Sequence, residues 1–95
     1  MLLSIGYDNF LWSPSILGVF KPDSAPMKKL RRDASEKGLL IDSTNGRRTR
    51  ALILMNTCHV VLSALQPETL RARLNEQLKA QRMEEGKPIG GLLSG

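Results

Sequence analysis

The sequence predicts an α+β fold: a small, mostly antiparallel sheet with two helices, in a single domain. Three observations support this prediction. Short apolar runs bounded by turn residues alternate with two segments that have helical spacing. The length of 95 residues is within the usual size of one domain. The composition, 41% hydrophobic and 24% charged, is that of a globular protein and argues against a disordered or collagen-like chain.

The first twenty residues predict a strand, a turn and a second strand. An apolar run at residues 2–5 is closed by Gly6, and Asp8 and Asn9 supply turn chemistry before a second run at residues 10–12. Pro14 then interrupts the chain. Because proline has no N–H for a sheet ladder, residues 12–15 are expected to form a loop or an edge. A further apolar run follows at residues 16–20.

A helix is predicted from about residue 25 to residue 37. Ser24 is a good N-cap, and Pro26 falls in the first turn, where a missing N–H costs nothing. Gly38 stands directly after the predicted end, as glycine often does. One apolar face follows from the helical spacing of Met27, Leu30 and Ala34.

The middle of the chain predicts a further strand and a hairpin. Residues 39–41 are a short strand that ends in residues 42–46 (DSTNG), whose Asn-Gly pair is a strong turn signal. Residues 50–64 contain two apolar runs around a turn and predict an antiparallel hairpin. Because nearly every strand position is apolar, both faces of this hairpin should be covered. Two helices can hardly cover both faces, so we expect a partner subunit to supply the rest.

A second helix is predicted from Pro67, a residue that favours the first helical position. Its apolar residues form a narrow stripe at every fourth position, which suits docking against a sheet edge or a neighbouring chain: Leu70, Leu74 and Leu78. We assign residues 1–85 to the domain. Residues 86–95 contain four glycines and a proline and are expected to be a flexible C-terminal tail.

The charge is concentrated in one stretch. Residues 21–50 hold nine basic and four acidic side chains, which accounts for the whole net charge of +5. Such a field attracts polyanions, chiefly nucleic acid or anionic lipid. A single cysteine excludes an internal disulfide, and no apolar run approaches the ~20 residues of a membrane helix. With no signal peptide visible, we expect a cytoplasmic protein without a membrane partner.

Catalytic chemistry is poorly represented in the sequence. Cys58 and His59 are adjacent, so on a strand they would point to opposite faces and would not converge as nucleophile and base. A phosphate-binding glycine loop and a metal-ligand cluster are both missing from the sequence. We therefore expect a binding protein, with no enzymatic activity, no cofactor and no small-molecule substrate.

The most informative motif is NGRRTR at residues 45–50, which places Arg47, Arg48 and Arg50 at a turn. A guanidinium group presents a fixed fork of donors that pairs with phosphate or with guanine. Three arginines without a lysine favour that use over general solubility. A charged turn without any ligand is the alternative. Single-stranded RNA is less favoured than duplex DNA because readers of RNA offer aromatic platforms, and the sequence places no aromatic near these arginines.

Four segments carry a resemblance to a known family. Each segment is similar to a motif of that family: residues 5–9 (IGYDN) to IGFGN, residues 22–29 (PDSAPMKK) to PESAPIKR, residues 40–51 (LIDSTNGRRTRA) to LIDATYGRRTRA, and residues 59–69 (HVVLSALQPET) to HVILSAVQPET. These motifs, in this order and spacing, are those of the RemA family of bacterial regulatory proteins. The resemblance covers roughly residues 4–70.

The resemblance implies a small subunit that assembles into a ring-like homo-oligomer and binds duplex DNA as a transcriptional regulator associated with the nucleoid. The paired arginines that the family uses for DNA contact correspond to Arg47 and Arg48. Ser15 occupies the place of another family arginine, and Lys21 stands where the family usually has serine. We predict a DNA interface of six residues: Arg47, Arg48, Arg50, Lys21, Lys28 and Lys29. Because of Ser15, a ring-forming scaffold with lost or weakened DNA binding remains the alternative.

Overall fold

The computed structural model describes residues 1–86, with side chains described through residue 82. Its first element is the predicted hairpin of β1 (Leu2–Gly6) and β2 (Asn9–Trp12), which pair antiparallel. Pro14 lies in a single 3-10 turn, Ser13–Ser15, which leads into β3 (Ile16–Phe20). The predicted hairpin and the break at Pro14 are thus confirmed, and the apolar run at residues 16–20 forms a further strand.

The strands form two sheets, and the prediction of a single sheet was wrong. β1 and β2 pair only with each other, whereas β3, β4 (Leu40–Asp42), β5 (Ala51–Met55) and β6 (Val60–Ser63) form a second sheet in the order β3-β5-β6-β4. The 3-10 turn redirects the chain after β2, so β3 enters a different sheet. β4 runs parallel to β6 because two chain reversals separate them, while the other pairs are antiparallel as predicted.

Both helices begin where the sequence predicts. α1 (Ala25–Glu36) is capped by Ser24, whose hydroxyl accepts a hydrogen bond from the Met27 amide at 3.3 Å. It ends before Gly38, which has the left-handed φ of +70° that glycine adopts without strain. α2 (Pro67–Gly86) starts at the predicted proline. Gly86, the first residue of the predicted tail, is the last residue of α2, and the rest of that tail, residues 87–95, lies outside the described residues.

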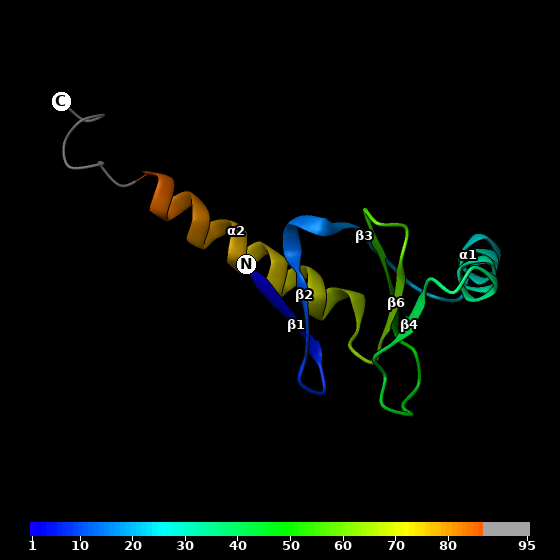
Figure 1. Cartoon of the computed structure of the whole chain (residues 1–95). Coiled ribbons are helices and arrows are strands. Elements are labelled where there is room, and N and C mark those ends of the chain that lie inside the picture. Colours follow the sequence, from blue (N-terminus) through cyan, green and yellow to red (C-terminus); the bar gives the residue numbers. More distant parts are fainter. Residues whose placement is uncertain (87–95) are drawn as a thin grey trace.

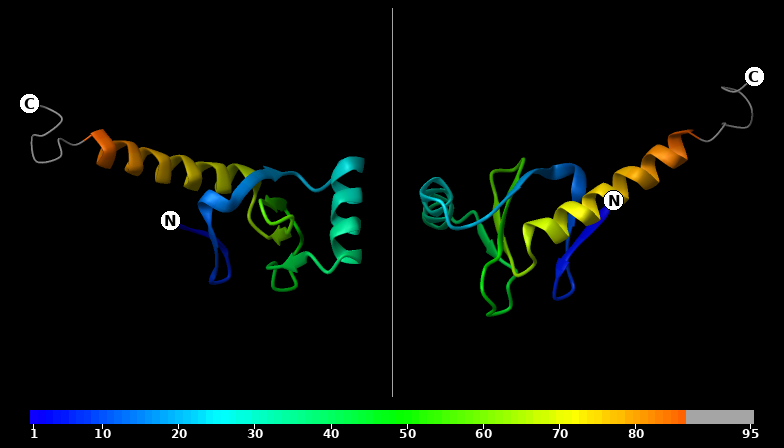
Figure 2. Two further views of the ribbon diagram at one scale, coloured as in Figure 1. Left: turned by 45° about the horizontal axis from the view of Figure 1, so that its top comes forward. Right: turned by 180° about the vertical axis from the view of Figure 1, so that it is seen from behind.

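The β5–β6 hairpin is apolar on both faces, and this chain covers both of them itself (Figures 1 and 2). On one face, Leu52 and Leu62 pack with Ala34 of α1. On the other, Ile53 and Val61 pack with the β1–β2 hairpin and α2. The expectation that a partner subunit must cover one face was therefore wrong. That expectation counted only the two helices as cover. The β1–β2 hairpin also covers the hairpin face that carries Ile53 and Val61, where it contributes Leu3 and Ile5 to the core.

α2 docks by only part of its apolar stripe. Leu70 is fully buried and Leu74 is partly buried, but Leu78 is 49% exposed. The C-terminal half of the helix extends away from the sheets (Figure 2). Two of its polar side chains contact β1: Arg73 donates to the Ser4 carbonyl at 2.9 Å, and Gln77 donates to the Leu2 carbonyl at 2.8 Å.

Candidate nucleic-acid interface

The loop between β4 and β5 carries the arginines, and its first residues are held firmly. The Asp42 carboxylate accepts hydrogen bonds from the Thr44 hydroxyl at 2.6 Å and from the Thr44 amide at 2.8 Å. The Ser43 hydroxyl donates to the Leu62 carbonyl of β6. Ser43 and Thr44 are both buried. The loop therefore starts from a fixed base, although most of its later residues are exposed.

The same contacts affect the ionisation of Asp42. The pKa of this exposed carboxyl is lowered below its usual value. The largest cause is the hydrogen bond from the Thr44 hydroxyl, followed by the bond from the Thr44 amide, and the positive charge of Arg31 acts in the same direction. A lowered pKa means that Asp42 contributes stability above the pKa of the unfolded chain and loses it as the pH falls through the folded value. The carboxylate is therefore ionised at neutral pH, where it can accept both hydrogen bonds.

The predicted Asn-Gly turn is confirmed. Asn45 and Gly46 have φ values of +54° and +79°, as in a type I′ turn, and the Arg47 amide donates to the Thr44 carbonyl at 3.0 Å. After the turn, the Arg50 amide donates to the Ser63 carbonyl at 2.8 Å, which fixes the entry into β5. Arg47, Arg48 and Arg50 are exposed, so their side chains are available to a ligand.

Three of the six predicted residues lie together. Arg48 and Arg50 line a depression of about 190 Å³ together with Lys21. Lys21 directly follows β3, which pairs antiparallel with β5. The pairing of Phe20 with Leu52 explains this arrangement, because it brings the end of β3 beside the start of β5. The remaining lining residues are Pro22, Asp23, Thr49 and Gln66. Three cations and one carboxylate, that of Asp23, surround this polar depression, so its lining carries a net positive charge.

Arg47 takes a separate position. Its guanidinium carbon is 5.9 Å from the centre of the Tyr7 ring, in the turn between β1 and β2. The inference that no aromatic lies near the arginines was therefore wrong in space, although it holds along the sequence. Forty residues separate Tyr7 from Arg47, so sequence spacing gave no indication of the contact.

Lys28 and Lys29 belong to a different surface. Both are exposed on α1. Lys28 lines a second depression with Arg31 and Arg32, two cations outside the predicted interface. The six predicted residues thus lie on two cationic surfaces: the β4–β5 loop with Lys21, and the outer face of α1. Only the first gathers cations from separate segments around one depression.

Ser15, which takes the place of a family arginine, lies away from the arginine loop. Its carbonyl accepts a hydrogen bond from the Asn56 amide at 2.7 Å, just beyond the end of β5, whereas Arg50 directly precedes the start of that strand. A strand of this length spans about 17 Å. Ser15 is therefore separated from the arginine loop of the same subunit by the length of β5.

The residues considered for catalysis do not assemble into a site. Cys58 is exposed in the β5–β6 turn, and the Thr57 hydroxyl lies 2.7 Å from Nδ1 of His59. Within the side chains that the structure describes, His, Cys, Asp and Glu form no group of three that could hold a metal ion. Neither helix of the described chain is long and apolar enough to cross a bilayer. The chain is thus a small α+β protein with an exposed, arginine-rich loop between β4 and β5.

Comparison with known proteins gives the family. The pattern of the RemA-like family, described as extracellular matrix regulatory protein A-like, matches residues 2–74. Extracellular matrix regulatory protein A of Bacillus subtilis is 43% identical over 86 residues, which cover 90% of this chain and 94% of the relative. A protein of Geobacillus kaustophilus that is named as a regulatory protein is 50% identical over 72 residues, which cover 76% of this chain and 83% of the relative. The chain belongs to the RemA-like family of regulatory proteins.

Proposed function

We propose that this RemA-like protein is a non-enzymatic transcriptional regulator that binds duplex DNA in the cytoplasm, at the nucleoid, as a ring-like homo-oligomer. The observation that carries the proposal is the grouping of Lys21, Arg48 and Arg50 around one depression, with Arg47 exposed on the same loop. Regulatory names among its relatives are consistent with this role.

The chemistry of the loop suits the phosphates of a duplex. Arginine forks pair bidentately with phosphate oxygens, and each neutralised phosphate releases counterions. Arg47 covers a face of the Tyr7 ring, so that face is not free to stack on an unpaired base. This arrangement favours a duplex over a single strand. Roughly three to five phosphate contacts per subunit would bind weakly at cellular salt, so several subunits must act together.

Exposed apolar surfaces support self-association. The pairings of Leu2 with Trp12 and of Ser4 with Phe10 place Leu2, Phe10 and Trp12 on one face of the β1–β2 hairpin, and each is more than half exposed. Exposed apolar groups that are contiguous mark interaction sites. We propose that this hairpin face contacts a second copy of the chain.

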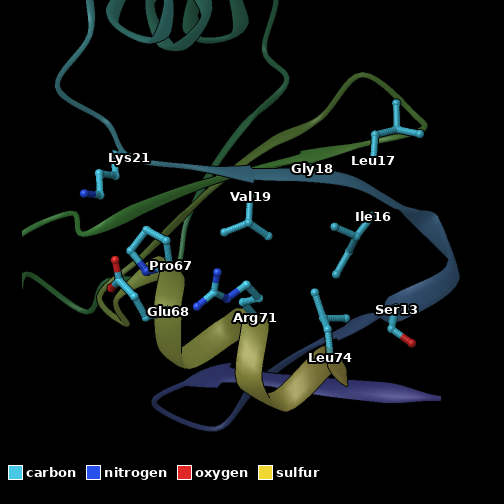
Figure 3. A pocket seen from close by; sticks show the side chains of 10 residues that line it. All are labelled: Ser13, Ile16, Leu17, Gly18, Val19, Lys21, Pro67, Glu68, Arg71 and Leu74. Carbon is cyan, nitrogen blue, oxygen red and sulfur yellow. The ribbon is translucent and has the colours of Figure 1, made fainter. Parts of the chain in front are cut away.

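A groove between β3 and α2 offers a second apolar surface. It has a volume of about 520 Å³, and Figure 3 shows Ile16, Val19 and Leu74 converging in it beside Arg71. β3 is also an edge strand of its sheet. The hairpin face and the groove involve different residues, so a contact between them would be head to tail. Contacts of that kind close into rings when the rotation permits.

Fluorescence anisotropy with a labelled duplex of random sequence tests DNA binding. We expect binding at 50 mM salt that weakens by about 10³–10⁵-fold at 200 mM, if two subunits together make about six to ten phosphate contacts. A single strand of the same length is the control and should bind more weakly. A wild-type protein that does not bind the duplex even at low salt contradicts the proposal and favours the ring-forming scaffold.

Light scattering with size-exclusion chromatography tests the oligomer. We expect a mass several times the 10.5 kDa of the chain at micromolar concentration. Replacing Trp12 with serine on the exposed hairpin face should lower that mass, and replacing Leu78 on α2 with serine provides a comparison outside the hairpin. A stable monomer of the wild-type protein would contradict self-association.

A further inference from the structure

We propose that Tyr7 is a positioning residue of the DNA interface, whose ring holds the Arg47 guanidinium in place for a phosphate. The inference rests on the proposed function and extends the interface to a second loop. The Arg47 guanidinium carbon is 5.9 Å from the Tyr7 ring centre, within the range of a cation–π contact. Both side chains are exposed, so the arginine can still reach a ligand.

The backbone at Tyr7 is a second observation that points to a role for the ring. Tyr7 and Asp8 form the two-residue turn of the β1–β2 hairpin, with left-handed φ values of +54° and +61°. Such turns favour asparagine and glycine, and a bulky side chain is strained there. Unfavourable backbone conformations of this kind cluster at functional sites. The turn itself does not need an aromatic side chain, but the contact with Arg47 does.

Asn9 ties this turn to the arginine loop. Its side-chain amide donates to the Gly6 carbonyl at 3.0 Å and to the Tyr7 carbonyl at 3.2 Å, and it lies 3.5 Å from the Ser43 carbonyl at the start of the β4–β5 loop. The two loops lie at the same end of the molecule, the lower end in Figure 1. The Tyr7 ring thus has a defined position relative to Arg47.

A held guanidinium binds phosphate more readily than a free one. An exposed arginine loses side-chain freedom when it pairs with a ligand, and contact with a ring lowers that loss in advance. The tyrosine is uncharged, so it does not neutralise a phosphate or release a counterion itself. Its contribution should therefore alter affinity without altering the number of ions released.

The test compares Tyr7→Asn, Tyr7→Phe, Arg47→Ala and the double variant Tyr7→Asn/Arg47→Ala in duplex titrations at several salt concentrations. Asparagine suits a positive φ, so Tyr7→Asn removes the ring without harming the turn. We expect Tyr7→Asn to weaken binding by about two- to fivefold per engaged subunit with an unchanged salt slope. Tyr7→Phe should bind like the wild type. Arg47→Ala should lower the salt slope by about one per engaged subunit.

The double variant decides whether the ring acts through Arg47. We expect it to bind no more weakly than Arg47→Ala alone, because the ring then has no guanidinium to hold. If Tyr7→Asn binds like the wild type while Arg47→Ala is weakened, the role of Tyr7 is refuted and the proposed function stands. An additional loss in the double variant also refutes it. If the wild-type protein does not bind the duplex, both proposals fail.

Discussion

Replacing both Arg47 and Arg48 with alanine is expected to weaken duplex binding by on the order of 100-fold or more. Each guanidinium makes charge-assisted hydrogen bonds, and a bond of that type contributes about 1.5–3 kcal/mol. The two side chains leave the loop in different directions, one toward Tyr7 and one into the depression shared with Lys21. The variant therefore removes cations from both parts of the interface. Fluorescence anisotropy at constant salt measures the loss.

Lys28→Ala/Lys29→Ala is the matched control, because it removes the same charge from α1. Both pairs are exposed, so neither variant should shift the free energy of unfolding by more than about 0.5 kcal/mol. We expect the lysine variant to lose much less affinity than the arginine variant. Equal losses would show that the overall charge of the chain, and not the arginine loop, determines binding. Unchanged affinity of the arginine variant would refute the proposed interface.

Replacing Leu70 with alanine is expected to destabilise the fold by about 2–5 kcal/mol. The Leu70 side chain is fully buried where α2 meets Leu3 and Ile5 of the hairpin, so its truncation leaves a cavity between these elements. A domain of this size has a total stability of only about 5–15 kcal/mol, so the loss is a large fraction of it. Urea denaturation followed by circular dichroism measures the change.

Leu78→Ala is the matched control on the same helix. Leu78 continues the apolar stripe of Leu70 and Leu74, but 49% of its surface is exposed, so its truncation within one subunit should cost far less. Equal destabilisation by the two variants would contradict the docking of α2 described above. A loss at Leu78 that depends on protein concentration would instead place this leucine in a contact between subunits.

Local signals in the sequence predicted the individual elements well. Ser24 and Gly38 mark the two ends of α1, and Pro67 begins α2. The Asn-Gly pair forms the expected turn. Each of these residues acts on the backbone at its own position. These signals depend on neighbours within about four residues. They require no knowledge of how the elements pack.

The arrangement of the elements was less predictable, because it depends on contacts between distant segments. The parallel pairing of β4 with β6 and the separate β1–β2 sheet follow from how the chain turns after each strand. The candidate interface also depends on which distant segments lie side by side, so the sequence predicted its grouping only in part. Lys21 joins Arg48 and Arg50 through strand register, whereas Lys28 and Lys29 follow the outer face of α1. Charge counting treats these lysines alike, and only the fold separates them.

The contact of α2 with β1 has a consequence for solubility. A strand with a free edge offers carbonyl groups to any other strand, and such edges initiate aggregation. Arg73 and Gln77 donate to the carbonyls of Ser4 and Leu2, so a foreign strand meets these acceptors already occupied. α2 also places the charge of Arg73 beside the β1–β2 hairpin, on which Phe10 and Trp12 are exposed. The contact of α2 with β1 thus limits the uncontrolled growth of β-structure from that edge.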